Sequence, residues 1–119
     1  MNVRFETLGR TTVVIPEGKL DYGAAEDFQK QLEPLLAAGP SGVPTAVIID
    51  CSALDYVSSA GLRAFLLTAR TAQRAGIAFG VCALKPAVRE VFELSGFSRV
   101  IAVHADRATA LGQAPPQPT

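Results

Sequence analysis

The sequence predicts an α/β fold in which about four helices cover a mixed, mostly parallel β-sheet. Short apolar runs alternate along the chain with segments whose apolar residues recur at helical spacing. Such alternation is typical of parallel strands, because each intervening helix returns the chain to the same edge of the sheet. At the start, two β-rich segments are separated only by Gly9-Arg10, which predicts an antiparallel hairpin.

The first part of the predicted domain holds the hairpin and one helix. Strands are expected at residues 3–7 and 11–15, and a helix is expected at 21–38, before the common helix terminator Gly39. Pro34 lies inside the helical pattern, so the helix is expected to kink or to end early there. The apolar face of this helix comprises Ala25, Phe28, Leu32, Leu35 and Leu36.

The second part of the predicted domain alternates strands with helices after a loop at 40–44. Strands are expected where apolar runs are bounded by turn residues, at 46–50, 77–83 and 99–103. Helices are expected before Gly76, from Pro86 to Gly96, and at 106–111 with Asp106 as N-cap. The helical residues expected to face the core are Leu62, Phe65, Leu66, Ala69, Val88, Val91 and Phe92.

The composition predicts one globular domain at residues 1–112, followed by a disordered tail at 113–119 that contains three prolines. Eleven Lys and Arg residues balance eleven Asp and Glu residues, so the formal net charge is zero. A neutral chain lacks the positive field that non-specific nucleic-acid binding requires, and we expect no direct nucleic-acid partner. No apolar run is long enough for a membrane span, and no signal peptide is recognised.

The cysteine and histidine content predicts neither a metal nor a cofactor. One histidine and two cysteines cannot build a conventional zinc site. We expect a cytoplasmic protein in which Cys51 and Cys82 are reduced and packed, with a disulfide between them as the alternative.

No set of catalytic residues is recognised either, and we expect a protein that is not an enzyme. A serine hydrolase needs a base beside its nucleophile, and the only histidine is His104, at the end of the last predicted strand. Residues 57–61 read Val-Ser-Ser-Ala-Gly, which is not a nucleophile elbow. A phosphoacceptor at Asp50 would need acidic metal ligands after the first strand, where the chain has Pro16-Glu17-Gly18.

The segment 55–63 is the most informative, because it joins a predicted strand to the second helix. The carboxyl ends of parallel strands are where ligands usually gather. One of the two serines Ser58 and Ser59 is explained as a helix N-cap. A second interpretation is that one serine accepts a phosphate, which the helix dipole and Arg63, one turn later, would stabilise.

Three stretches of the chain resemble the STAS domain of bacterial anti-sigma factor antagonists. Residues 17–21 (Glu-Gly-Lys-Leu-Asp) resemble the family's Gly-x-Leu-Asp turn before its first helix. Residues 47–62 resemble the strand and phosphorylation loop Asp-Ser-Ser/Thr-Gly-Leu. Residues 81–84 and 92–97 resemble the penultimate strand and the helix that ends in Ser-Gly. Each motif is weak alone, but their order and spacing together are specific.

The resemblance implies a protein that binds an anti-sigma factor, often a serine kinase, and thereby frees a sigma factor. It also implies that the kinase phosphorylates a loop serine to end binding and that a phosphatase reverses this step. Aligned on Gly61-Leu62, the phosphoacceptor falls on Ser59, the following Ser/Thr falls on Ala60, and the family Asp falls on Ser58. Ser58 is therefore the second choice for modification.

Further residues are expected to contact the partner. The resemblance places Asp21 near the loop, although an N-cap role for the first helix explains Asp21 equally well. On the second helix, Arg63, Leu67, Arg70 and Arg74 share one stripe at 100° per residue. A solvated basic face explains Arg70 and Arg74, but not the large apolar Leu67. The expected partner-binding residues are Asp21, Ser58, Ser59, Ala60, Gly61, Arg63 and Leu67.

An alternative function remains open at this point. The chain is also compatible with a STAS module that does not switch, in a stressosome-like scaffold or in a lipid-transport complex. In that case Ser59 would be a structural residue.

Overall fold

Within the described residues, 1–37 and 44–112 of the computed structural model, the strands form one six-stranded sheet with the main order β1-β2-β3-β5-β6. The N-terminal hairpin is antiparallel, and the pairs β2-β3, β3-β5 and β5-β6 are parallel. The predicted mixed, mostly parallel sheet is thus confirmed. The bounds of these strands are β1 Asn2–Leu8, β2 Thr11–Leu20, β3 Ala46–Asp50, β5 Ala78–Cys82 and β6 Ala102–His104.

The long strand β2 pairs with different strands along its length. Thr11–Val14 pairs with β3, whereas Gly18–Leu20 pairs in parallel with β4 (Leu54–Val57). The register of the second pairing shifts between Gly18 and Lys19, and Gly18 adopts a φ of +89° that glycine tolerates best. This irregularity lets the end of β2 leave the β3 ladder and run beside β4.

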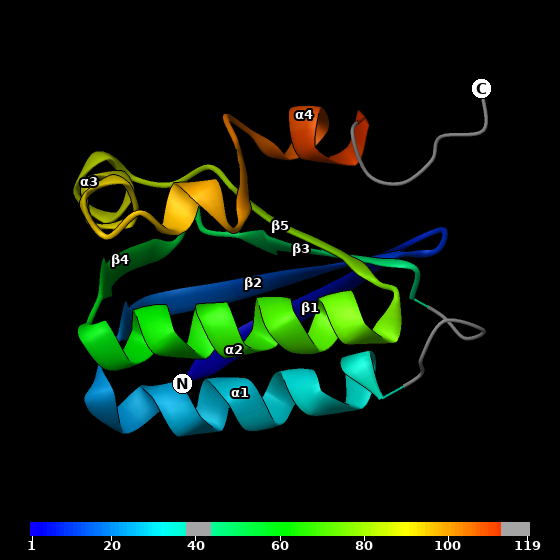
Figure 1. Cartoon of the computed structure of the whole chain (residues 1–119), viewed down its shortest axis with the longest axis horizontal. Coiled ribbons are helices and arrows are strands. Elements are labelled where there is room, and N and C mark those ends of the chain that lie inside the picture. Colours follow the sequence, from blue (N-terminus) through cyan, green and yellow to red (C-terminus); the bar gives the residue numbers. More distant parts are fainter. Residues whose placement is uncertain (38–43, 113–119) are drawn as a thin grey trace.

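Two parallel helices cover one face of the sheet, and the remaining elements cover the other face and one end. α1 (Tyr22–Leu36) and α2 (Ser59–Ala75) lie side by side and begin at the same end of the molecule (Figure 1). α4 (Arg107–Gly112) lies on the opposite face, and α3 (Pro86–Leu94) packs beside β4. No helix among the described residues is long and apolar enough to cross a membrane.

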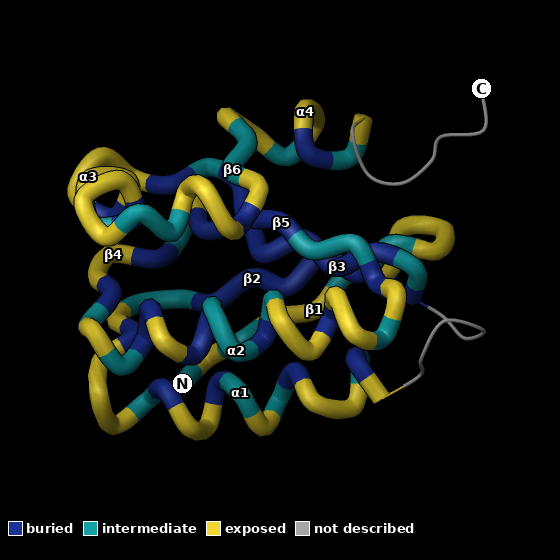
Figure 2. Tube along the Cα trace, viewed as in Figure 1, coloured by how far each residue is buried: buried dark blue, intermediate teal, exposed yellow. Residues whose placement is uncertain are grey.

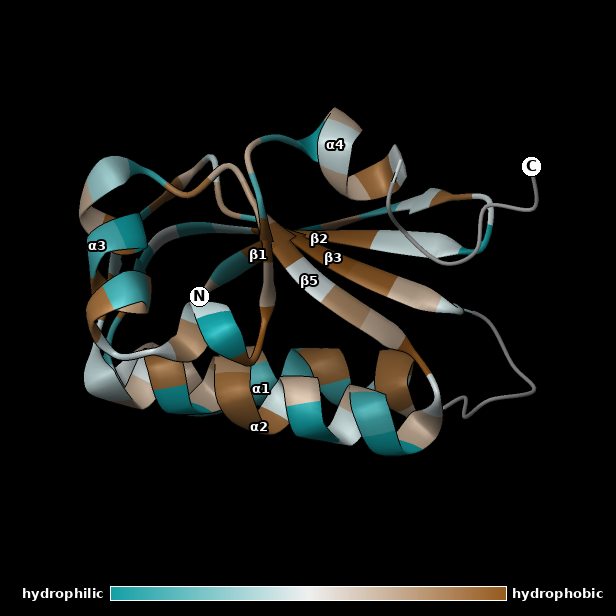
Figure 3. Ribbon diagram, turned by 45° about the horizontal axis from the view of Figure 1, so that its top comes forward, coloured by the Kyte–Doolittle hydropathy of each residue, from teal (hydrophilic) through white to brown (hydrophobic). Residues whose placement is uncertain are grey.

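The main core lies between the sheet and the helices α1, α2 and α3. One phenylalanine from each helix contributes to it, and Phe65 lies 5.4 Å from Phe28 and 5.3 Å from Phe92 between ring centroids. All three side chains are fully buried. Figure 2 shows buried residues concentrated along the inner sides of α1 and α2, and Figure 3 shows that hydrophobic residues predominate on β2 and β3. These aromatic pairs stabilise the layers beyond the area that they bury.

A smaller apolar cluster and an ion cluster attach α4 to the opposite face. Ala110 of α4 packs with Ile48 and Cys82. The Arg107 guanidinium donates to Asp50 Oδ2 from Nε at 3.1 Å and from Nη2 at 2.8 Å, and to Glu6 Oε1 from Nη1 at 2.8 Å. Asp50 is only 6% exposed, so Arg107 neutralises a carboxylate that lies almost out of water.

Both cysteines are free and buried, as the sequence predicts. Burial raises the pKa of Cys82 to about 12, and the nearby carboxylate of Asp50 adds to this shift. Burial also raises the pKa of Cys51. Neither thiol is exposed for reaction in the folded domain.

The expected boundaries differ from the observed ones at several elements, and β2, expected at 11–15, continues to Leu20. α1 ends at Leu36 although Pro34 lies inside it, because one missing N–H donor in the last turn does not outweigh the burial of Leu36. The sequence predicts no strand between 50 and the second helix, but Leu54–Val57 forms β4. The strand expected at 99–103 begins only at Ala102, because a 3₁₀ turn (Phe97–Arg99) follows Gly96. Gly39, most of the loop at 40–44 and the tail at 113–119 lie outside the described residues.

The expected core face of α2 needs one correction. Leu66 is partly exposed, whereas Ala64, Thr68 and Ala72 are buried together with Phe65. At 100° per residue, these buried positions flank Phe65 on the side away from Leu66. The small side chains let the helix axis approach the sheet closely, and this leaves Leu66 at the margin of the interface.

Candidate functional site

The chain segments that lead into α1 and α2 are hydrogen-bonded to each other. Leu20, the last residue of β2, pairs with Val57, the last residue of β4. The next residue, Ser58, donates its backbone N–H to the Leu20 carbonyl at 2.9 Å. The first turns of both helices therefore lie at the same end of the sheet, and the segments containing Asp21 and Ser59 are brought together there.

Ser58 is the N-cap of α2. Its backbone is extended, with φ −83° and ψ 174°, and its Oγ accepts a hydrogen bond from the Gly61 N–H at 3.1 Å. The same Oγ donates to the Leu20 carbonyl at 3.2 Å. The hydroxyl of Ser58 thus donates and accepts within the protein, and a phosphate on it would remove the proton that it donates to the Leu20 carbonyl.

Ser59 differs from Ser58 in every one of these respects. It is the first residue of α2, it is exposed, and its side chain makes no hydrogen bond within the described residues. The first turn of α2 contains no acidic residue. The positive end of the helix dipole and its outward N–H groups therefore face solvent at Ser59, as in a site that accepts anions.

The substitution of Ser58 for the family Asp keeps one property and removes another. Both Ser and Asp are strong N-caps, so the geometry of the first turn is preserved. A serine brings no negative charge, so no carboxylate at this position competes with a new anion on Ser59.

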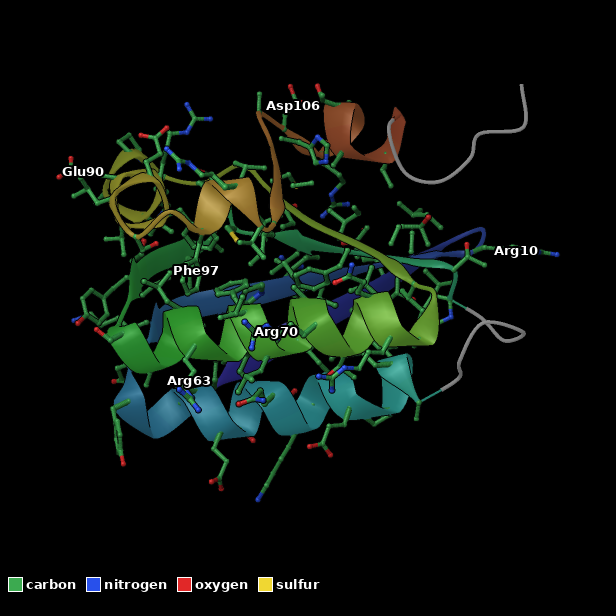
Figure 4. The ribbon with its side chains drawn as sticks, in the orientation of Figure 1. Arg10, Arg63, Arg70, Glu90, Phe97 and Asp106 are labelled. Carbon is green, nitrogen blue, oxygen red and sulfur yellow. The ribbon has the colours of Figure 1, made fainter. Side chains whose placement is uncertain are left out.

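Arg63 lies one helical turn after Ser59, is exposed and makes no ion pair within the described residues. In Figure 4 its side chain extends from α2 toward α1. Arg63 and Ala60 line an open groove of about 320 Å³ between the two helices. The remaining lining residues come from α1 and are Tyr22, Ala25, Glu26 and Gln29.

Asp21 is the N-cap of α1, because its Oδ1 accepts a hydrogen bond from the Ala24 N–H at 3.0 Å. The capping interpretation is therefore confirmed, while partner binding by Asp21 stays a prediction.

Sequence reasoning overlooked the two tyrosines in these segments. Tyr22, next to Asp21, is 85% exposed, and Tyr56 of β4 is 49% exposed. Amphipathic aromatic side chains are common in binding surfaces. A tyrosine beside each of the two helix starts is therefore the sequence feature that could have indicated this surface.

Gly61 has a structural reason to be glycine. A Cβ at this position would lie 2.7 Å from the Leu20 carbonyl oxygen, 2.9 Å from Leu20 Cγ and 3.0 Å from Val57 Cγ1. The absence of a side chain lets the first turn of α2 press directly on the end of β2. Ser59 belongs to this turn and is exposed.

The stripe of α2 that begins at Arg63 continues along the helix, away from the helix starts, through Leu67, Arg70 and Arg74. Leu67 is half-buried, yet it is not among the described residues that form the main core or pack against it. Arg70 and Arg74 are exposed and make no ion pair within the described residues. The structure thus brings together the helix starts, with Asp21, Ser58, Ser59, Ala60, Gly61 and Arg63, and sets Leu67 one turn further along.

The structure also bears on two other kinds of site, a phosphoacceptor aspartate and a metal site. Asp50 is engaged by Arg107 and is almost fully buried, so it does not present a free carboxylate for phosphorylation. Among residues 1–37 and 44–112, no group of His, Cys, Asp and Glu side chains is arranged to hold a metal ion.

Comparison with known proteins identifies the family. A family model described as the STAS domain matches residues 2–110. The chain belongs to the STAS domain family. A protein of Bordetella bronchiseptica named as an anti-sigma factor antagonist, BtrV, is 44% identical to this STAS domain over 110 residues, covering 92% of this chain and 91% of the relative.

Solved structures share the fold of this STAS domain. A Thermotoga maritima protein described as an anti-sigma factor antagonist superposes with a TM-score of 0.87 at 15% identity, covering 96% of this chain and 95% of the other. The Bacillus protein SpoIIAA in its phosphorylated form superposes with a TM-score of 0.70 at 22% identity, covering 94% and 98%. At these identities, the likeness concerns the STAS fold alone.

Proposed function

We propose that this STAS domain is an anti-sigma factor antagonist that is switched off by phosphorylation of Ser59. In its unmodified form it binds an anti-sigma factor that is also a serine kinase, and so frees a sigma factor. Phosphorylation of Ser59 by that kinase ends the binding, and a phosphatase restores it. The named relative at 44% identity supports the antagonist role.

The observation that carries the choice of Ser59 is the contrast between the two serine hydroxyls. Ser58 Oγ accepts from the Gly61 N–H at 3.1 Å and donates to the Leu20 carbonyl at 3.2 Å, whereas Ser59 is exposed at the helix start. A kinase can reach Ser59 without breaking the cap of α2. The resulting phosphate would be stabilised by the helix N-terminus, and Arg63, which has no partner in the described chain, could pair with it.

The effect on the partner is electrostatic. A phosphate adds about −1.5 to −2 charges to a chain whose formal net charge is zero. The added charge lies one residue before Ala60, which lines the groove between α1 and α2 together with the exposed Tyr22. A partner that binds the neutral surface would then have to bury a phosphate that keeps net negative charge even when Arg63 pairs with it, which is unfavourable. The modification therefore ends binding without unfolding the domain.

Substitution of Ser59 is expected to separate binding from switching. Incubation with the cognate kinase and ATP should place phosphate on Ser59, as located by mass spectrometry, and Ser59→Ala should take up none. Calorimetric titration with the same kinase should show binding retained by Ser59→Ala and lost by Ser59→Asp. Candidate kinases are the anti-sigma factors of the same genome.

Ser58→Ala is the matched control for this experiment. It removes the cap and should lower the free energy of unfolding by about 1 kcal/mol, but Ser59 should still be the phosphorylated residue. In the wild type, phosphate found on Ser58 and not on Ser59 would contradict the assignment. Tight binding that ignores both Ser59 variants would favour the alternative of a non-switching module in a scaffold or a transport complex.

Leu67 and Arg63 are proposed to extend the docking surface along α2. Leu67→Glu should weaken binding of the kinase at least about tenfold, because it removes apolar contact and places a charge in the interface. The melting temperature should stay unchanged, since Leu67 does not pack on the main core. Arg74→Glu, two turns further along α2, introduces the same side chain outside the proposed surface. Equal affinities of the wild type and Leu67→Glu would exclude Leu67 from the interface.

A further inference from the structure

A second groove lies on the other side of α2, away from α1. It has a volume of about 360 Å³ and lies between the C-terminal half of α2, the start of β5 and Val100. The Arg70 side chain lines this groove, whereas the Arg63 side chain extends the other way, toward α1 (Figure 4). The lining residues are Ala69, Arg70, Gln73, Ile77, Ala78, Phe79 and Val100.

One wall of this groove is an unpaired sheet edge. β5 pairs with β3 from Ala78 onward, but its pairing with β6 begins only at Gly80. The chain before β6 does not pair there because it forms the 3₁₀ turn, in which Val100 and Ile101 both donate their N–H groups to the Phe97 carbonyl. Within the described chain, the outer side of Ala78 and Phe79 therefore has no neighbouring strand.

The backbone groups at this edge can be assigned from the hydrogen bonds of β5. The Ala78 N–H donates to the Thr45 carbonyl on the β3 side, and the Ala83 N–H donates to the His104 carbonyl on the β6 side. Backbone groups alternate between the two sides of a strand, so the Phe79 N–H and the Ile77 carbonyl point outward. They form one donor and one acceptor for an added strand.

The side chains of the groove favour an apolar side chain and a negative charge. Val100 is 61% exposed, which is unusual for a large apolar residue, and Phe79 is only partly buried. Arg70 is the only charged lining residue and makes no ion pair within the described residues. The whole of α2 contains arginines but no Asp or Glu, so a positive potential extends along the groove.

We propose that this groove binds an extended, acidic segment of a partner protein, which adds to the free edge of β5. Its backbone pairs with the Phe79 N–H and the Ile77 carbonyl, an apolar side chain covers Val100, and a carboxylate pairs with Arg70. Strand addition of this kind takes its affinity from main-chain bonds and its specificity from alternate side chains. The site is separate from Ser59 and does not depend on the switch.

The probe is a fluorescein-labelled synthetic peptide with the sequence Glu-Val-Glu-Val-Glu, titrated into the ¹⁵N-labelled full chain at low ionic strength. We expect amide shifts concentrated at Ala69–Gln73, Ile77–Phe79 and Val100, and affinity that falls as salt is added. Binding should weaken at least about tenfold for a peptide with Lys in place of Glu. It should weaken similarly for a peptide N-methylated at every residue, because that peptide has no N–H to donate to the Ile77 carbonyl.

Variants of the protein complete the test. Arg70→Glu and Val100→Glu should each weaken binding at least about tenfold. Leu94→Glu should not, because Leu94 is an apolar residue outside the groove, on α3, and at 80% exposed it is even more accessible than Val100. The proposal would be overturned if the N-methylated peptide bound as tightly as the unmodified peptide, or if Val100→Glu bound the peptide as tightly as the wild type. Binding would then be unspecific attraction of the acidic peptide to the arginines. The proposal would also be overturned by Val100-dependent self-association of the free protein, which would make a second copy the occupant, or by an absence of shifts at millimolar peptide.

Discussion

Gly61→Ala is expected to lower the free energy of unfolding by about 3 kcal/mol. The new Cβ would lie 2.7 Å from the Leu20 carbonyl oxygen and 3.0 Å from Val57 Cγ1, and neither the end of β2 nor that of β4 can move without losing their pairing. The first turn of α2 must shift outward instead. Urea denaturation followed by circular dichroism measures the loss.

Gly23→Ala is the matched control, because Gly23 lies in the first turn of α1. A Cβ there would meet only Asp21 Oδ1, at an ordinary 3.7 Å. Since alanine favours the helix, Gly23→Ala should leave the domain as stable as the wild type or slightly more stable. Equal stability of Gly61→Ala and Gly23→Ala would show that α2 does not need the close approach to β2.

Arg107→Met is expected to destabilise the domain by about 3 kcal/mol at pH 7. Methionine keeps much of the apolar contact of Arg107, but it leaves the carboxylate of Asp50 buried and without its cation. Arg4→Met is the control, because Arg4 pairs with Glu17 at the surface, with a side chain 62% exposed. The control should change stability by less than about 1 kcal/mol. A similar loss in both variants would mean that Arg107 is only another surface charge.

The pH dependence of Arg107→Met supplies an independent check. Burial acts to raise the pKa of Asp50, but hydrogen bonds from Ser52 and the charge of Arg107 outweigh it and lower the pKa below its ordinary value. In the wild type, this contribution to stability is present at neutral pH and is lost as the pH falls through the lowered pKa. Without Arg107, burial dominates and the carboxyl group is easier to accommodate when protonated. The stability gap between wild type and variant should therefore narrow from pH 7 to pH 3.

The order of the elements follows from the sequence because it depends on local patterns. Apolar runs such as 46–50 and the glycine after α2 mark elements without knowledge of their neighbours. β4 is different: only Leu54 and Val57 of its four residues are buried, and it exists because β2 continues past β3 to pair with it. The exposure of Leu66 likewise depends on how closely α2 approaches the sheet, which no periodicity within the helix specifies.

The sequence predicted which segment forms the candidate site, but it did not predict which serine caps α2 and which is exposed. The sequence placed Ser58 and Ser59 at the start of a helix and left open which of them was the cap. The Leu20 carbonyl decides this, and it lies 38 residues away in the chain from Ser58. The open edge of β5 was beyond sequence reasoning as well, because it arises from a 3₁₀ turn that delays the start of β6.

The buried thiols of Cys51 and Cys82 give the domain an internal reporter of its own opening. Burial raises the pKa of Cys82 to about 12 and so disfavours the thiolate, which is the form that attacks electrophiles. Cys51 follows β3 and Cys82 ends β5, and the Cys51 N–H donates to the Cys82 carbonyl at 2.9 Å. Cys51 lies in the main core, whereas Cys82 lies under α4 and packs with Ala110. The rate of alkylation therefore measures opening of the core at Cys51 and displacement of α4 at Cys82.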